Sequence, residues 1–370
     1  MKQSAIMQRD IWSILGLPFD AVTLQQSIGQ CRQSMESGDK CFLSTPNLNF
    51  AIASQSDNAF FESVVDSDLN VADGMPLIWV AKLLGVPVTE RVAGSTLFDA
   101  LSKQEGLSRK IKVFFFGGQQ GVAELAHQQL NQHSPAMESC GFYDPGFVSV
   151  DEMSTLKIIE YINSCEPDFV VVALGARKGQ EWIQKNKDKL NTSVISHLGA
   201  VINFVAGNVE RAPILWQRLG MEWLWRIRQE PSLWKRYLMD GLAFMRLMTV
   251  NILPLAVYDR FLRRTASYCI PCVVEIEQQE SVVIHLAGSI HHGEMADVKQ
   301  HYTKVIEEYN GDVVIDCEQL VYIDSAFIAT TLLFQRYLNK RDRLLVLKNV
   351  PSRIVRLLSL SSVSERFTLF

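Results

Sequence analysis

Five short apolar runs, separated by segments of helical periodicity, dominate the first two hundred residues. They cover residues 41–44, 68–72, 112–116, 168–174 and 193–198. Runs this apolar are typical of parallel strands that are buried on both faces of a sheet. Residues 11–40 alternate apolar and polar positions at helical spacing after a short turn, which predicts a helix there. The pattern predicts an α/β fold with a Rossmann-like parallel sheet at its core.

Polar residues or glycines follow each of these runs. Parallel strands place their carboxyl ends along one edge of the sheet, where ligands usually bind. Thr45-Pro46-Asn47 follows the first run, and Asp73-Gly74 follows the second. Thr45 and Asn47 could bind a ligand by hydrogen bonds or could simply close the turn after the strand.

Asp73 stands where a predicted strand meets a predicted helix at residues 77–84. The surrounding sequence is Val71-Ala72-Asp73-Gly74-Met75-Pro76. A carboxylate at such a position can act as a general base, or it can cap the helix that follows. The residues alone leave both interpretations open.

The third run leads into Gly117-Gly118 and then into a helical segment. A glycine-rich turn at a helix N-terminus lets backbone N–H groups approach a phosphate, although a tight strand-to-helix turn needs the same residues. The spacing lacks the GxGxxG dinucleotide fingerprint, which argues against a dehydrogenase. No His, Cys or Asp spacing resembles a metal site, so we expect neither a metal nor another cofactor.

From about residue 272 the pattern changes to that of a separate, small α/β domain. Strands are expected at residues 273–277, 281–286, 312–316 and 343–347, and helices at 294–309, 326–339 and 354–360. About a hundred residues are enough for an independent domain.

Charge is unevenly distributed along the 370 residues, whose net charge is −4. Residues 211–264 contain ten Lys and Arg against four Asp and Glu, and residues 211–237 hold four of the seven tryptophans. Tryptophans interleaved with cations suit a membrane interface, although a helical cap with snorkelling arginines would look the same. The apolar stretch at 241–258 is interrupted by Arg246, Asn251 and Pro254, which favours an interfacial over a spanning helix.

Several motifs, in order, resemble the WecG/TagA/CpsF glycosyltransferases (glycosyltransferase family 26). They are Thr45-Pro46-Asn47, Ala72-Asp73-Gly74, Glu90-Arg91-Val92-Ala93-Gly94, Gly117-Gly118, Leu174-Gly175-Ala176-Arg177-Lys178 and Arg211-Ala212-Pro213. The resemblance implies an inverting transfer of a sugar, an N-acetylhexosamine or a related one, from a UDP-sugar to a polyprenyl-diphosphate-linked acceptor in cell-surface polysaccharide synthesis.

The resemblance also implies roles for individual residues. Asp73 would be the catalytic base. The substrate-binding residues would be Thr45, Asn47, Arg91, Gly117, Gly118, Lys178 and Gln180. Arg226 and Arg236 would contact the lipid diphosphate. Arg91 follows Glu90, so a surface ion pair is the alternative role for its side chain.

The chain departs from the family pattern at residues 175–181. Many members read Gly-x-Pro-Lys-Gln-Glu there, whereas this chain reads Gly175-Ala176-Arg177-Lys178-Gly179-Gln180-Glu181 and shifts the glutamine by one position. This departure motivates an alternative function: a catalytically degenerate scaffold that binds a nucleotide-sugar and acts through its C-terminal domain.

The C-terminal hundred residues resemble STAS domains. The resemblance rests on Val313-Val314-Ile315-Asp316 and on Val321-Tyr322-Ile323-Asp324-Ser325 before a helix. In regulatory members a serine at the position of Ser325 is phosphorylated, which would add charge at a helix N-terminus. Phe327 replaces the usual glycine two residues later, so a plain docking or dimerisation module is the other interpretation.

These observations predict three segments: a glycosyltransferase core at 1–207, a basic, Trp-rich helical appendage and linker at 208–268, and a STAS-like domain at 269–370. Seven scattered cysteines fit a reducing cytoplasm. The expected location is the cytoplasm, peripherally on the inner face of the cytoplasmic membrane. The expected partners are the UDP-sugar, the lipid-linked acceptor, the membrane surface, further copies of the chain and a protein that binds the STAS-like domain, but no nucleic acid.

Overall fold

The computed structural model describes residues 7–104, 108–209, 212–213, 215–216, 220–278 and 281–370. Its larger sheet has six strands in the order β4-β3-β8-β7-β5-β6, and every neighbouring pair is parallel. The strands are β3 (Cys41–Ser44), β4 (Leu69–Asn70), β5 (Ile111–Gly117), β6 (Met137–Tyr143), β7 (Phe169–Ala173) and β8 (Val194–His197). The predicted parallel α/β core is confirmed.

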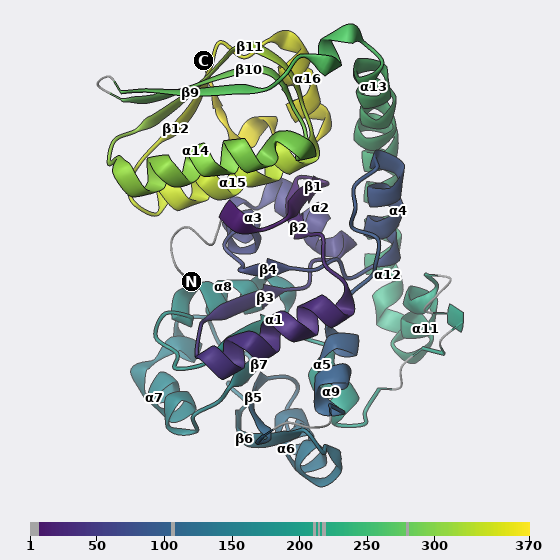
Figure 1. The fold of residues 1–370 in the computed structure, drawn as a ribbon. Helices are drawn as coiled ribbons and strands as arrows, with labels where there is room; N and C mark the ends of the chain where they lie inside the picture. Colours follow the sequence, from purple (N-terminus) through teal and green to yellow (C-terminus); the bar gives the residue numbers. More distant parts are fainter. Residues whose placement is uncertain (1–6, 105–107, 210–211, 214, 217–219, 279–280) are drawn as a thin grey trace.

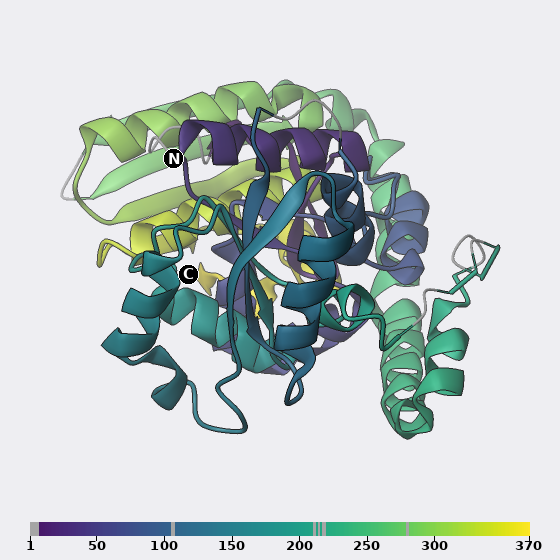
Figure 2. The same cartoon turned by 90° about the horizontal axis from the view of Figure 1, so that it is seen from below.

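Helices cover both faces of this sheet (Figure 1, Figure 2). Phe115 and Val171 face one apolar layer, whereas Phe114, Phe116 and Val172 face the other, because successive strand residues point to opposite sides. The first layer is covered by α1 (Leu24–Ser37), α5 (Gly94–Ser102), α6 (Val122–His133) and α9 (Val201–Val205). The second is covered by η2 (Glu152–Ser154), α7 (Leu156–Ser164) and α8 (Ala176–Asn186).

The helix predicted over residues 11–40 is partly wrong. Only α1 is helical, and it is preceded by an antiparallel hairpin of β1 (Ile11–Ile14) and β2 (Leu17–Asp20). Leu15 and Gly16 have φ angles of 52° and 85°, as a two-residue type I′ hairpin turn requires. Both strands are buried throughout, but Ser13, Pro18 and Asp20 interrupt their apolar residues, so neither strand shows a continuous apolar run or a regular alternation. Sequence analysis also missed β6, an edge strand whose sequence mixes apolar residues with Glu138, Ser139 and Gly141 and therefore forms no apolar run.

The second domain contains a five-stranded sheet in the order β13-β12-β11-β10-β9, in which only the β9–β10 pair is antiparallel. Its strands are β9 (Val273–Gln278), β10 (Val282–Ile290), β11 (Val313–Ile323), β12 (Leu345–Lys348) and β13 (Thr368–Leu369). Its helices are η6 (His292–Glu294), α14 (Met295–Glu308), α15 (Ser325–Asn339), α16 (Ser352–Leu360) and η7 (Ser364–Arg366). The predicted small α/β domain is therefore present.

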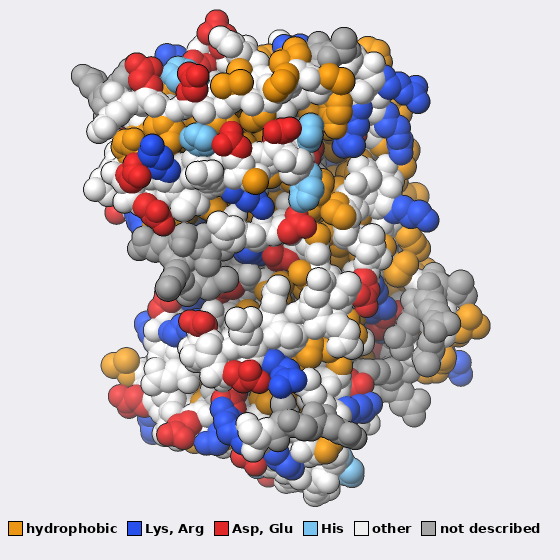
Figure 3. Space-filling view, in the orientation of Figure 1, with side chains coloured by type: hydrophobic (Ala, Val, Ile, Leu, Met, Phe, Trp, Pro, Cys, Tyr) orange, Lys and Arg blue, Asp and Glu red, His pale blue; other side chains and the backbone are white. Residues whose placement is uncertain are grey.

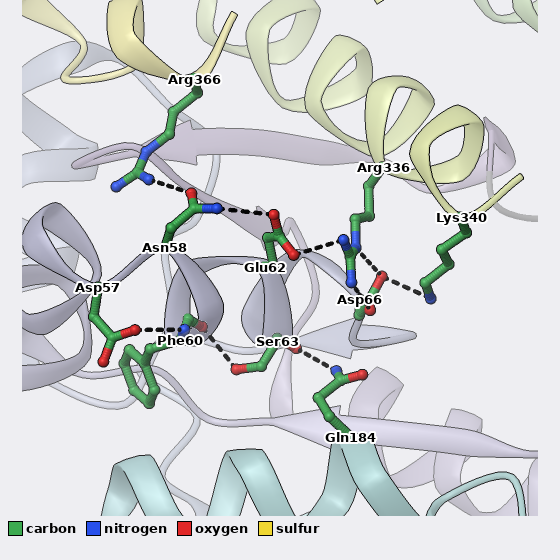
Figure 4. A network of polar contacts seen from close by, with 10 residues as sticks. All are labelled: Asp57, Asn58, Phe60, Glu62, Ser63, Asp66, Gln184, Arg336, Lys340 and Arg366. Atoms are coloured by element: carbon green, nitrogen blue, oxygen red, sulfur yellow. Dashed lines mark hydrogen bonds and ion pairs between the residues drawn. The ribbon is translucent and has the colours of Figure 1, made fainter. Parts of the chain in front are cut away.

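The two domains share one apolar cluster, in which α15 packs on the β1–β2 hairpin. The core contributes α2 (Leu48–Ser56), α3 (Asn58–Val65) and α4 (Met75–Leu84) to this region. Polar contacts reinforce the junction: the guanidinium of Arg336 binds both Asp66 and Glu62, and Arg366 donates to Asn58 (Figure 4).

A continuous helical segment connects the domains (Figure 1). It comprises η3 (Pro231–Leu233), α12 (Trp234–Leu247), a π-helical turn η4 (Met248–Ile252) and α13 (Leu253–Arg263). It is preceded by α11 (Glu222–Gln229) and followed by η5 (Ala266–Cys269). Residues 231–263 are long and apolar enough to cross a membrane, and only 17% of the most apolar window is buried against the protein.

Candidate active site

Backbone hydrogen bonds join the loops that follow β3 and β4 to the loop before α5. Asp73 N donates to Pro46 O at 2.9 Å, and Val92 N donates to Ala72 O at 2.9 Å. Thr45, Asp73 and Arg91 therefore belong to three loops that are fixed to one another. All three loops lie at the carboxyl ends of parallel strands or beside them, the edge at which ligands bind in such sheets.

Asp73 lies one residue before the N-cap of α4, which is Gly74. Its carboxylate lies 3.5 Å from Nε of Arg91, and both side chains are partly buried. Burial raises the pKa of Asp73, and the nearby charge of Glu222 adds to this, against the attraction of Arg91. Asp73 is thus a carboxylate with increased proton affinity at the edge of the sheet, as a general base requires.

Glu222, the first residue of α11, connects the basic appendage to this edge. Its Oε2 lies 2.5 Å from Nη2 of Arg91, and its Oε1 lies 3.7 Å from Nη2 of Arg226. Arg91 and Arg226 therefore share one carboxylate, and Arg91 also faces Asp73. Sequence analysis missed Glu222; the signal for it was its position four residues before Arg226 on a helix.

The preceding residue, Glu90, does not form the surface ion pair that was the alternative role for Arg91. Its Oε2 accepts a hydrogen bond from Leu24 N at the start of α1. The partners of Arg91 instead come from two distant segments, Asp73 and Glu222. Burial alone would lower the pKa of Arg91, but these two carboxylates raise it, so the guanidinium remains charged.

Thr45 and Asn47 lie next to Asp73, with different environments. Thr45 is buried against Gly94, and a Cβ at Gly94 would lie 3.3 Å from Thr45 Oγ1 and 2.4 Å from Leu198 Cδ2. Asn47 caps α2, because its Oδ1 accepts from Phe50 N at 3.2 Å. The amide oxygen of Asn47 therefore has a structural role at the turn after β3, as the alternative interpretation expected. Ligand binding by the amide nitrogen of Asn47 stays a prediction.

Gly117 and Gly118 form the tight end of β5, with φ angles of 91° and 102°. A Cβ on Gly117 would lie 2.9 Å from the carbonyl oxygen of Ala173. The N–H of Gly118 donates to that same carbonyl at 2.8 Å. These glycines are therefore required by the backbone turn, and a phosphate contact at this position stays a prediction.

Lys178 and Gln180 both lie on α8 but have different surroundings. Gln180 is buried, and its Nε2 donates to Ser44 Oγ at 2.9 Å, directly before Thr45. Its Oε1 is buried without a hydrogen-bond partner among the described residues. Lys178 is exposed and donates to Val148 O, beyond the far edge strand β6. The structure therefore places Gln180 close to Thr45. Lys178 lies farther along the carboxyl edge of the sheet, towards β6.

At residues 175–181, where the sequence departs from the family pattern, the structure explains why residue 179 is glycine. A Cβ at this position would lie 2.2 Å from Cδ2 of His197, so only glycine lets the imidazole ring rest on α8. His197 lies 2.6 Å from Leu174 O through its Nε2. Burial lowers the pKa of His197, so the neutral ring donates to that carbonyl and connects the ends of β7 and β8.

The remaining predicted residues lie farther along the chain. Arg236 is exposed on α12, with its guanidinium 5.1 Å from the centre of the Tyr237 ring. Ser325 is the half-buried first residue of α15, whose N-cap is Asp324. Arg211 and Arg218 lie outside the described residues. Within the described part of the chain, no group of three or more His, Cys, Asp or Glu residues is arranged to hold a metal ion.

Comparison with known proteins finds relatives of both parts of the chain. Residues 274–369 match the Mlab, STAS domain family. A Staphylococcus aureus (strain MRSA252) protein named N-acetylglucosaminyldiphosphoundecaprenol N-acetyl-beta-D-mannosaminyltransferase is 27% identical over 225 residues, 60% of this chain and 85% of that protein. A Bacillus spizizenii protein of the same name is 31% identical over 182 residues, 49% of this chain and 68% of that protein.

The glycosyltransferase match covers the whole larger sheet and extends through α12. Residues 12–256 match the Glycosyl transferase WecG/TagA/CpsF family. This span contains Asp73, Arg91 and Glu222 and ends within α13. The chain therefore belongs to the WecG/TagA/CpsF glycosyltransferase family and carries a C-terminal STAS domain.

Proposed function

We propose that this protein transfers an N-acetylhexosamine from a UDP-sugar to a polyprenyl-diphosphate-linked saccharide, with inversion at the anomeric carbon. The observation that carries the proposal is the Asp73–Arg91–Glu222–Arg226 cluster at the carboxyl edge of the sheet. The cluster combines a carboxylate of raised pKa with two guanidinium groups, and the relatives are named for a transfer to a diphosphoundecaprenol-linked sugar.

The proposed reaction is a single displacement. Asp73 accepts the proton of the acceptor hydroxyl while that oxygen attacks the anomeric carbon of the donor. The bond from that carbon to the diphosphate breaks, and UDP leaves with the electron pair. A base whose pKa lies closer to the working pH takes the proton more effectively, and burial moves Asp73 in that direction.

Arg91 and Arg226 are the proposed partners of diphosphate oxygens. Both pair with Glu222, whose two carboxylate oxygens are acceptors of the same kind as phosphate oxygens. A diphosphate carries more charge than one carboxylate, so it can compete for these guanidinium groups. Positive charge near the departing oxygen stabilises the negative charge that develops there.

The relatives' names include a lipid-linked acceptor, so we propose that the connecting helices lie on the membrane surface. Along α12 and α13, exposed apolar side chains such as Leu242, Met245 and Val257 occupy one face. Basic side chains accompany apolar ones along the edge formed by α13 and α4 (Figure 3). An apolar face with flanking cations binds anionic bilayers.

Contacts along the opposite face support an interfacial rather than a spanning position. Leu255 and Ala256 are buried, Arg260 donates to Leu83 O on α4, and Asn251 lies 3.5 Å from Ser359 O on α16. A spanning helix would lose these contacts with both domains.

The proposal is tested with purified protein, a panel of UDP-sugars and a polyprenyl-diphosphate-linked N-acetylglucosamine acceptor. We expect transfer from at least one N-acetylhexosamine donor, and loss of at least about 100-fold in kcat for Asp73→Asn. Asp39→Asn, a change in an exposed loop, is the control. Failure of every donor would contradict the enzyme and favour the nucleotide-sugar-binding scaffold, and normal turnover by Asp73→Asn would remove Asp73 as the base.

A further inference from the structure

A cavity of about 400 Å³ lies between the two domains, away from the proposed active site. From the core it is lined by the beginning of β3, at Cys41 and Phe42, and by Lys187 after α8. From the STAS domain it is lined by the last turns of α15, including Arg336 and Lys340. Strand β3 starts in this cavity and ends next to Thr45, so the two sites lie at opposite ends of one strand. The volume is within the range of small-molecule sites.

Positive charge dominates the lining. Six cationic side chains face the cavity, against the three carboxylates of Asp66, Asp68 and Asp188. The cations are Arg9, Lys40, Lys187, Arg336, Lys340 and Arg341.

Three of the cations are already neutralised. Arg9 pairs with Asp20 at 2.6 Å. Arg336 and Lys340 both pair with Asp66, at 2.9 Å and 2.7 Å, and Arg336 also pairs with Glu62 at 2.7 Å, as Figure 4 shows. These pairs hold the wall of the cavity together.

The other three cations have no carboxylate partner among the described residues. Lys40 Nζ donates to the carbonyl oxygens of Lys187 and Asp188. The Arg341 guanidinium lies 3.7 Å from the centre of the Tyr337 ring, and Lys187 Nζ lies 5.2 Å from that of Phe42. Carbonyl oxygens and rings do not neutralise these cations. Asp66, Asp68 and Asp188 attract Lys187 but form no ion pair with it, so each of the three cations can still pair with an anion in the cavity.

Lys187 is the least solvated of them. Burial lowers its pKa, and the neighbouring Lys340 lowers it further, although Asp66 opposes the effect. Such a group gains more from a bound anion than a solvated lysine, because part of its hydration has already been lost.

We propose that this interdomain cavity is a binding site for a soluble anion that carries two or more phosphate groups. Three cations that form no ion pair with a described carboxylate match a multivalent anion better than a single carboxylate, and lysine and arginine are the usual ligands of phosphate oxygens. Lys40 and Lys187 belong to the core and Arg341 to the STAS domain. The ligand therefore bridges the two domains and stabilises the contact between them.

The test is calorimetric titration of the full-length protein with inorganic pyrophosphate. We expect binding by the wild type and at least about tenfold weaker binding by the Lys187→Gln/Arg341→Gln double variant. Lys189→Gln removes an exposed charge two residues from Lys187 and outside the cavity lining, and should change the affinity less than about twofold. Equal losses in Lys189→Gln and the double variant would overturn the proposal, as would wild-type affinity in the double variant.

Two further variants keep the test decisive. Arg341 is exposed, so Arg341→Gln alone should fold normally and still weaken binding if the double variant is unstable. Arg226→Gln changes the proposed active site and should bind pyrophosphate at the cavity like the wild type. Loss of binding in Arg226→Gln with retention in the cavity variants would place pyrophosphate at the active site and overturn the proposal.

Discussion

Arg91 Nη2 lies 2.5 Å from Glu222 Oε2, so a guanidinium of the core holds the first turn of α11 beside Asp73. This contact connects two segments that are 131 residues apart in the chain. It also places two carboxylates near one cation. The proton affinity of Asp73 therefore depends on the position and charge of the appendage.

Glu222→Gln is predicted to lower the pKa of Asp73. Removing the negative charge of Glu222 favours the ionised form of Asp73, and loosening α11 would reduce burial and act in the same direction. The acidic limb of the pH profile of kcat/KM should therefore move to lower pH. Glu230→Gln, at the exposed end of α11, should leave the limb in place. A shift to higher pH would contradict the proposed electrostatic coupling.

Asp66→Asn is predicted to destabilise the fold at neutral pH. Burial opposes ionisation, but hydrogen bonding by Arg336 and the charge of Lys340 outweigh it and lower the pKa of Asp66 below its ordinary 3.8. Its ionised form therefore stabilises the fold above the unfolded-state pKa, and this contribution is lost as pH falls through the lower, folded-state pKa. We expect a loss of about 1–3 kcal/mol in the free energy of unfolding at pH 7, because Arg336 and Lys340 lose a charged partner while Arg336 keeps Glu62.

Asp73→Asn should show the opposite pH dependence. The folded-state pKa of Asp73 is raised, so ionisation opposes folding as pH rises above 3.8 and through the folded-state value. This variant should be at least as stable as the wild type at pH 7, and the difference should vanish in acid. Urea denaturation of both variants at pH 3 to 7 measures the two trends, and parallel curves for the two variants would refute the assignment.

The fold was predictable where burial produced long apolar runs. The runs at β3, β5, β7 and β8 identified the parallel sheet because these strands are buried on both faces. The β1–β2 hairpin was not predicted, because the element that buries its second face is α15, more than 300 residues later in the chain. Its pattern of apolar residues depends on a domain that local sequence does not reveal.

The candidate site shows the same limit. Asp73 lies in the loop after β4 and Arg91 in the loop before α5, and each belongs to a short motif that the sequence shows directly. Glu222 belongs to another segment and joins them only through the fold. Gln180 also follows from a motif; its Nε2 donates to Ser44 inside the protein, and a substrate contact of this residue stays a prediction.

Gly179→Ala is predicted to lower the free energy of unfolding by about 1–3 kcal/mol. The new methyl group would lie 2.2 Å from Cδ2 of His197, whose ring is held by Leu174 O. The ring would have to leave the ends of β7 and β8. His197→Ala should restore much of the loss when combined with Gly179→Ala, because it removes the clashing ring. Additive losses in a double-mutant cycle measured by urea denaturation would show that the two side chains do not meet.

Leu242→Asp/Val257→Asp is predicted to weaken binding to vesicles that contain anionic phospholipid. Both side chains are exposed on the connecting helix, 49% for Leu242 and 67% for Val257, so the change should leave the fold intact. Burying such side chains in a bilayer contributes about 1.5–3 kcal/mol each, and two introduced carboxylates also repel anionic lipid. We therefore expect at least about a tenfold loss of affinity in a vesicle sedimentation assay. Leu344→Asp, at 62% exposure on the STAS domain, introduces the same charge on an apolar surface residue elsewhere. If Leu344→Asp, with one added carboxylate, weakens binding by half as much in free energy as the double variant with two, net charge alone explains the effect. The helix would then not be the membrane-binding surface.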